Sequence, residues 1–147
     1  MPRRHSACQG KSLTSWLADS NLFLRLLTVD DRGQHPRAVR FFEKASRGEC
    51  RIVCAPPVLF ELAWILRAGY KTPRADVLKI LSAVYAMPGI ALTDAPLVAR
   101  ALTLADETNS EFADAYIAAA AGAAGCAGVA TFNRKDFERL GVRLADL

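Results

Sequence analysis

The sequence lacks several features that would by themselves point to a class of protein. It has no unbroken apolar run of about 18 residues, the length that a membrane-spanning helix needs. The basic opening, Met1 to His5, is not followed by the apolar segment of a secretory signal peptide. No glycine-rich phosphate loop is present, because Gly122 and Gly125 fall at the end of a predicted helix rather than before one. We therefore expect a cytoplasmic protein with no membrane contact and no nucleotide-binding loop.

Cysteine and histidine are also scarce. The four cysteines, which include Cys8, show neither a CxxC spacing nor the Cys/His spacing of a structural zinc site. Both histidines lie in the first quarter of the chain, and the sequence offers no Ser/His or Cys/His nucleophile pair. Cys50 and Cys54 flank a predicted strand and Cys126 opens another, which favours buried free thiols in a reducing compartment.

The length and composition are those of a folded domain. The 147 residues are 52% hydrophobic and 23% charged, which is enough apolar material for a core and too little charge for disorder. The net charge of +4 is mildly basic and agrees with a nucleic-acid partner, although many enzymes are equally basic. We expect residues 1–12 to be a flexible N-terminal extension and residues 13–147 to be a single domain.

Short apolar runs alternate with helical patterns along the whole chain. This alternation predicts an α/β fold, in which helices cover both faces of a parallel sheet of roughly five strands. The predicted strands are 13–18, 50–55, 90–92, 126–131 and, at an edge, 141–144. One predicted helix follows Asp19 directly, and the others are 35–47, 58–68, 74–86, 95–105, 112–124 and 134–140.

Asp19 follows the first predicted strand, which we expect to be buried. Ser20 and Asn21 come next and suit the N-cap of the following helix. In open α/β sheets, ligands bind outside the carboxyl ends of the strands, so Asp19 lies where chemistry is expected. The alternative is that Asp19 only caps the helix.

Two further acids interrupt apolar helical stripes. Asp114 lies on the same predicted helix face as Ile117 and Ala118, and Glu61 lies four residues before Ile65. An ionised carboxylate on such a face is costly to bury unless it is paired or bound to a metal ion. Either acid could instead lie at the edge of its stripe and reach solvent or an arginine.

Asp19, Glu61 and Asp114 can all be placed at the C-terminal edge of one sheet. Carboxylates that are brought together repel one another and raise each other's pKa. Mg²⁺ or Mn²⁺ would remove that repulsion, because both ions prefer hard oxygen ligands. A cluster of this kind, without His or Cys, suits metal-assisted hydrolysis of a phosphodiester.

Four segments of the sequence together resemble the PIN-domain nucleases, and in particular the VapC-type toxins of toxin–antitoxin pairs. They are Asp19–Leu22, Leu59–Leu62, Phe112–Ala115 and Thr131–Phe137, and the resemblance extends from Leu13 to the end of the chain. It implies a PIN-like three-layer sandwich and a Mg²⁺- or Mn²⁺-dependent endoribonuclease that cleaves RNA. The implied partners are a cognate VapB-type antitoxin and a second copy of the chain in a homodimer.

The resemblance also assigns roles to individual residues. Asp19, Glu61 and Asp114 match the three metal-binding catalytic acids of the family. Asn21 matches the polar residue that supports the first of these acids, and Thr131 matches the hydroxyl that precedes a fourth position.

At that fourth position, where many family members have an acid, this chain has Asn133. Asp136 follows three residues later and could complete the catalytic site through water or a second metal ion. Alternatively, Asn133 only caps the last helix and Asp136 interacts with the helix dipole. The missing acid leaves a second function open, that of a catalytically silent PIN-like module that binds RNA or protein.

Other residues near the expected site have two interpretations. Glu111 lies one helical turn before Asp114 and either reaches the same metal ion or is solvated. Arg134 and Lys135 either bind RNA phosphates or form a solvated face. Trp64 is expected in the core or in an interface rather than as a base-stacking platform.

Overall fold

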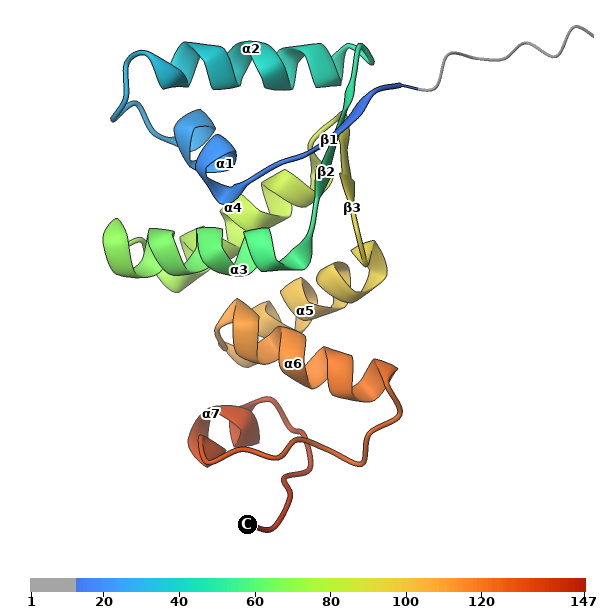
Figure 1. The fold of residues 1–147 in the computed structure, drawn as a ribbon. Coiled ribbons are helices and arrows are strands. Elements are labelled where there is room, and N and C mark those ends of the chain that lie inside the picture. Colours follow the sequence, from blue (N-terminus) through green and yellow to red (C-terminus); the bar gives the residue numbers. More distant parts are fainter. Residues whose placement is uncertain (1–12) are drawn as a thin grey trace, which may run out of the picture.

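The computed structural model describes residues 13–147, and the predicted flexible extension 1–12 lies outside the described residues. The chain folds into a small parallel sheet and a larger set of helices (Figure 1). The elements in chain order are β1 (Ser15–Leu17), α1 (Ser20–Leu27), α2 (Gln34–Ser46), β2 (Arg51–Cys54), α3 (Pro56–Trp64), the π-helix η1 (Ile65–Gly69), α4 (Arg74–Ala86), β3 (Ile90–Leu92), α5 (Ala95–Thr108), α6 (Phe112–Ala123) and α7 (Arg134–Arg139).

The sheet has the order β1-β2-β3, and both strand pairs are parallel. The predicted α/β class with a parallel sheet is therefore confirmed, but residues 13–147 contain three strands rather than about five. Residues 126–131 and 141–144 meet only in one parallel bridge, between Val129 and Leu144. There the Val129 N–H donates to the Arg143 carbonyl at 2.8 Å, so these two segments pair with each other instead of extending the sheet.

The first strand is exposed, although its apolar sequence predicted a buried one. The side chains of Trp16 and Leu17 are 55% and 68% exposed. Within the described residues β1 pairs only with β2, and its other edge has no neighbouring strand. An apolar run is buried only where another element covers it. Within the described residues, no further strand lies beyond the free edge of β1.

The core lies between β2 and the helices that surround it. Its fully buried side chains include Phe23, Ile52, Leu59, Leu62 and Leu81. Helix α2 packs on β2 and α4 packs on β3, while α3 contacts α1, α4 and α6. Each such side chain contributes about 1.5–3 kcal/mol by leaving water, so the core fixes the positions of α3 and α6 firmly.

The cysteines divide into two groups. Cys50 and Cys54 are buried free thiols, as predicted, and burial raises the pKa of Cys54 to about 11. Cys126 is a free but exposed thiol, so the prediction of burial was wrong there. It lies in the connection after α6 rather than in a strand. Cys8 lies outside the described residues.

Among residues 13–147, no helix combines the length and the apolar character that crossing a membrane would require.

Candidate functional site

Asp114 lies in the first turn of α6, just after a tight connection from α5. The connection works because Asn109, the C-cap of α5, adopts a left-handed conformation with φ of 56°, which asparagine tolerates better than most residues. Beside this connection lies a pocket of about 340 Å³. Its lining residues are Arg67, Arg74, Asn109, Ser110, Glu111, Asp114, Asp136 and Arg139.

Two arginines from different helices hold the connection in place. Arg74 of α4 donates to the carbonyls of Ala105 and Ser110, each at 3.3 Å, and to the side-chain oxygen of Asn109. Arg139 of α7 donates to the carbonyl of Asn109 at 3.1 Å. Because both arginines bind the residues directly before α6, they fix the position from which Asp114 projects.

A third arginine binds the N-cap residue of α6. Arg67, in η1, donates from Nη2 and Nε to Oε1 of Glu111 at 2.6 and 3.1 Å, and from Nη1 to the carbonyl of Thr72 at 3.2 Å. Both side chains of the ion pair are nearly half exposed. Glu111 is therefore not simply solvated, because its carboxylate is bound to an arginine at the rim of the pocket.

The pKa of Asp114 is raised above its ordinary value. Partial burial is the largest cause, followed by the negative charges of Asp136 and Glu111. Asp114 and Asp136 therefore lie close enough to repel each other, as expected for acids that share one site.

Asn133 and Thr131 support Asp136. The side-chain amide of Asn133 donates to Oδ2 of Asp136 at 2.8 Å, and the backbone N–H of Asn133 donates to Oγ1 of Thr131 at 3.0 Å. Asn133 is the N-cap residue of α7 but makes no side-chain capping bond. Its amide instead holds a carboxylate of the pocket, so the interpretation of Asn133 as only a helix cap does not describe its contacts.

Asp19 and Asn21 lie in a different hollow, a groove of about 500 Å³ lined mainly by residues of α1 and α2. Asp19 is exposed, and its Oδ1 accepts a hydrogen bond of 3.2 Å from the hydroxyl of buried Ser20. It is the N-cap residue of α1, yet its side chain makes no capping bond. Helix capping alone therefore does not account for this carboxylate.

Glu61 lies on the exposed side of α3 and lines neither hollow. Its neighbour Phe60 packs against Phe112 and Tyr116 of α6, with ring centroids 5.5 and 4.9 Å apart. Helix α3 thus lies against the helix that carries Asp114, while Glu61 itself faces solvent.

Of the predicted acids, the structure brings together only Asp114 and Asp136. In the part of the chain that the structure describes, no three acidic, histidine or cysteine side chains converge as a metal site would require. The assignment of Asp19 and Glu61 as further ligands therefore remains a prediction.

The Asp114–Asp136 pair fits a Mg²⁺ or Mn²⁺ ion. Both ions take hard oxygen ligands, and Mg²⁺ is commonly held by one or two carboxylates together with water and substrate phosphate. A cation would also relieve the repulsion that raises the pKa of Asp114.

The arginines of the pocket were missed in the sequence. Arg67, Arg74 and Arg139 lie on three separate elements, and only Arg139, one helical turn after Asp136, had a local signal. Arg134, expected either to bind phosphate or to be solvated, is exposed, donates to the carbonyl of Ala145 at 3.3 Å and does not line the pocket.

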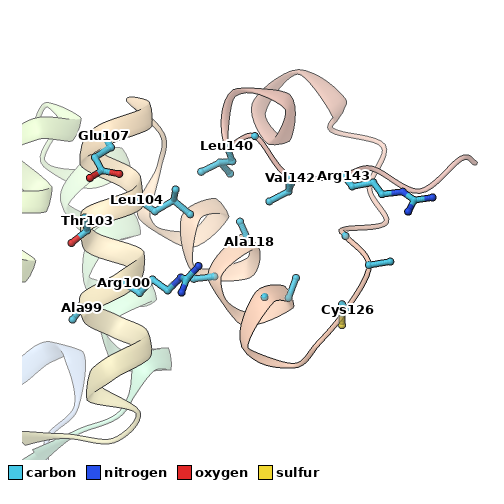
Figure 2. A pocket seen from close by; sticks show the side chains of 16 residues that line it. Ala99, Arg100, Thr103, Leu104, Glu107, Ala118, Cys126, Leu140, Val142 and Arg143 are labelled. Atoms are coloured by element: carbon cyan, nitrogen blue, oxygen red, sulfur yellow. The ribbon is translucent and has the colours of Figure 1, made fainter.

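A larger hollow than this pocket lies elsewhere in the described residues. It encloses about 730 Å³ between α5, α6 and the C-terminal segment (Figure 2). Small apolar side chains form much of its lining, with Arg100, Glu107 and Arg143 among them, but none of the predicted site acids. Size alone therefore does not identify the chemical site.

Comparison with known proteins gives one positive finding. A family model described as a PIN domain matches residues 17–142. This range includes the pocket lined by Asp114 and Asp136, called the acidic pocket below, and the groove of Asp19. No curated protein matches the sequence.

Proposed function

The chain belongs to the PIN-domain family, and from this membership we propose that it is a Mg²⁺- or Mn²⁺-dependent endoribonuclease of the VapC type. PIN domains are typically metal-dependent nucleases that act on RNA or other nucleic acid. The observation that carries the proposal for this chain is the pocket that Asp114 and Asp136 both line, where partial burial and then the charge of Asp136 raise the pKa of Asp114.

In this proposal each residue of the pocket has a defined task. Asp114 and Asp136 hold the metal ion, which when bound supplies an activated water and stabilises negative charge on the phosphate. Asn133 orients Asp136 through its amide hydrogen bond. Arg74 and Arg139 keep the connection before α6 in the conformation that aims Asp114 into the pocket.

The remaining assignments come from the resemblance to VapC-type toxins. They make Asp19 and Glu61 further metal ligands, Asn21 the support of Asp19, and Thr131 the support of Asn133. The same resemblance supports the proposals of a VapB-type antitoxin as partner, a homodimer, and action in the cytoplasm. The hydrogen bond from Asn133 to Oγ1 of Thr131 agrees with the supporting role of that hydroxyl.

A second candidate function is a catalytically silent PIN module that binds RNA or protein. Two observations favour it: Asn133 occupies a position where many family members have an acid, and no three acids converge within residues 13–147. The two candidates differ in the acidic pocket, which binds Mn²⁺ in a nuclease and not in a module whose site has decayed.

Cleavage of a mixed RNA pool by the purified chain, freed of any partner, tests the proposal. We expect cutting with Mn²⁺ or Mg²⁺, no cutting with EDTA, and no cutting by Asp114→Asn. Asp106→Asn is the matched control, because Asp106 is an exposed aspartate of α5 outside the pocket. Metal-independent cutting, or full activity of Asp114→Asn, would indicate a contaminating ribonuclease or a different site.

A further inference from the structure

A second hollow adjoins the acidic pocket. It encloses about 550 Å³, and Arg67, Glu111 and Asp114 line both. Its other lining residues come from α3, η1 and the start of α6: Phe60, Ala63, Trp64, Ala68, Phe112 and Ala113. A single surface therefore runs from the two aspartates, past the Arg67–Glu111 ion pair, to an aromatic and apolar hollow.

Trp64 is the unusual residue of this hollow. It is the last residue of α3, and its side chain is 70% exposed, so of the two expected positions, in the core or in an interface, the core is excluded. Phe60, four residues before it on the helix, packs on Phe112 and Tyr116, so the surface beside Trp64 is rigid. A large indole held open to water beside this rigid surface is suited to stacking on a flat ligand.

Arg67 supplies the charge next to this indole. Its contacts with Glu111 and Thr72 fix the guanidinium at the boundary of the two hollows and leave N–H groups of Nη1 and Nη2 for another acceptor. Arginine suits phosphate because its planar fork matches the phosphate oxygens. The π-helical turn that carries Arg67 follows Trp64 directly, and such turns are frequent at functional sites.

We propose that Trp64 and Arg67 form a subsite for one nucleotide of single-stranded RNA, next to the phosphate at the two aspartates. The base stacks on Trp64, and the phosphate of that nucleotide binds Arg67. Only an unpaired base exposes a face to an indole, so the subsite selects single strands over duplexes. Glu111 balances the charge of Arg67, but the guanidinium N–H groups that remain suit phosphate oxygens, which favours a nucleic acid over a protein segment as the occupant. This inference rests on the proposed nuclease function and names its substrate class.

The fluorescence of Trp64 provides a direct test. The chain has two tryptophans, so Trp64 is the sole tryptophan emitter in a Trp16→Phe variant. A short oligouridylate, added in EDTA so that metal-dependent cutting is blocked, is expected to quench this emission in a saturable way. An abasic ribose-phosphate oligomer of the same length is expected to bind more weakly and to cause no quenching, because it lacks bases.

Two substitutions separate stacking from charge. Trp64→Ala is expected to weaken oligouridylate binding about 5- to 150-fold, the range for loss of one stacked base, while Trp64→Phe retains part of the affinity. The matched control is Trp16→Ala, because Trp16 is also exposed but lies on β1, outside both hollows.

Arg67→Gln is expected to lower the slope of log affinity against log salt by about 0.7, the value for one phosphate contact in a single strand. Arg47→Gln is the control, because Arg47 also forms an exposed ion pair, with Glu49 at 3.2 Å, away from both hollows. Thermal unfolding of each variant identifies any loss of affinity that comes from misfolding.

Three results would overturn the subsite: unchanged Trp64 emission while RNA binds, equal quenching by the abasic oligomer, or equal affinity of Trp64→Ala and Trp16→Ala. If the emission of Trp64 changed with protein concentration and not with added RNA, this face would be assigned to a protein contact. Binding through Trp64 by a chain that never cuts RNA would contradict only the nuclease function. RNA cleavage by a chain whose Trp64 emission does not change when RNA is added would contradict only the subsite.

Discussion

The acidic pocket and the groove of Asp19 are built in different ways. The contacts around Asp114 join distant parts of the chain: Arg67 binds Glu111 across 44 residues, and Arg74 binds Ser110 across 36. The contacts around Asp19 are local, such as the hydrogen bond from its neighbour Ser20. In the same groove, Arg25 donates to Gln34, only nine residues away, at 2.8 Å.

This difference explains which chemistry each region can support. Long-range arginine contacts hold Glu111 and the connection before α6 in the pocket, where partial burial and then the charge of Asp136 raise the pKa of Asp114. The groove holds one exposed carboxylate with Arg25 and Arg37 among its lining residues, so it has a net positive set of side chains. The pocket is lined by three arginines and three acids, so its charges balance, and the cation site proposed there depends on Asp114 and Asp136, because the arginines bind Glu111 and the connection before α6. The groove becomes part of that site only if Asp19 acts on the same substrate.

Substitution of Asp19 gives the largest expected effect and tests whether the two regions act together. We expect Asp19→Asn to lose metal-dependent RNA cleavage by about 100-fold or more, as Asp114→Asn does, because loss of a ligand exceeds the 10- to 100-fold effect of an outer-shell change. Initial cleavage rates with Mn²⁺ measure it. Wild-type rates for Asp19→Asn, with Asp114→Asn inactive, would restrict the catalytic site to the pocket.

Removal of one arginine from each region compares their contributions to stability. Arg74→Ala is expected to lower the free energy of unfolding by about 1–3 kcal/mol, because it removes hydrogen bonds to Ala105, Asn109 and Ser110. Arg37→Ala, at an exposed arginine of the groove, is expected to change it by less than about 0.5 kcal/mol. Urea unfolding measures both, and equal losses would refute the idea that arginines stabilise the pocket specifically.

A smaller effect than that of Arg74→Ala is expected at the buried serines, one in each region. Ser20 is fully buried and donates to Asp19, and Ser110 is 5% exposed and accepts a hydrogen bond of 2.8 Å from Thr108. Each change to alanine is expected to cost about 0.5–1.5 kcal/mol of unfolding free energy, since no partner is left buried without another acceptor or water. A loss above about 3 kcal/mol at either serine would reveal a polar network that these contacts do not explain.

The sequence predicted local elements well. The expected bounds of α4, 74–86, and of β3, 90–92, agree with the structure, because apolar periodicity and the flanking prolines mark both. The helix expected over 95–105 continues to Thr108, since helix ends depend on the cap, here the left-handed Asn109. The exposure of β1 could not be predicted from its apolar sequence, because it depends on whether another segment pairs with the free edge of the strand.

The site shows the same limit. The acids could be placed on their elements, and the resemblance to PIN nucleases offered completion of the catalytic site as one of two alternatives for Asp136. Arg67 and Arg74 could not be found, because they reach the pocket through packing of η1 and α4 against the α5–α6 connection. A single arginine in a polar stretch gives no sign of a partner more than 30 residues away.

The central claim is that Asp114 and Asp136 form a cation site, and calorimetric titration with Mn²⁺ tests it most directly. We expect the wild-type chain and Asp106→Asn to bind Mn²⁺ with equal affinity. Asp114→Asn and Asp136→Asn are each expected to bind at least tenfold more weakly, with thermal unfolding confirming that they are folded. Equal Mn²⁺ affinity in all four proteins, or no binding by the wild type, would contradict the claim.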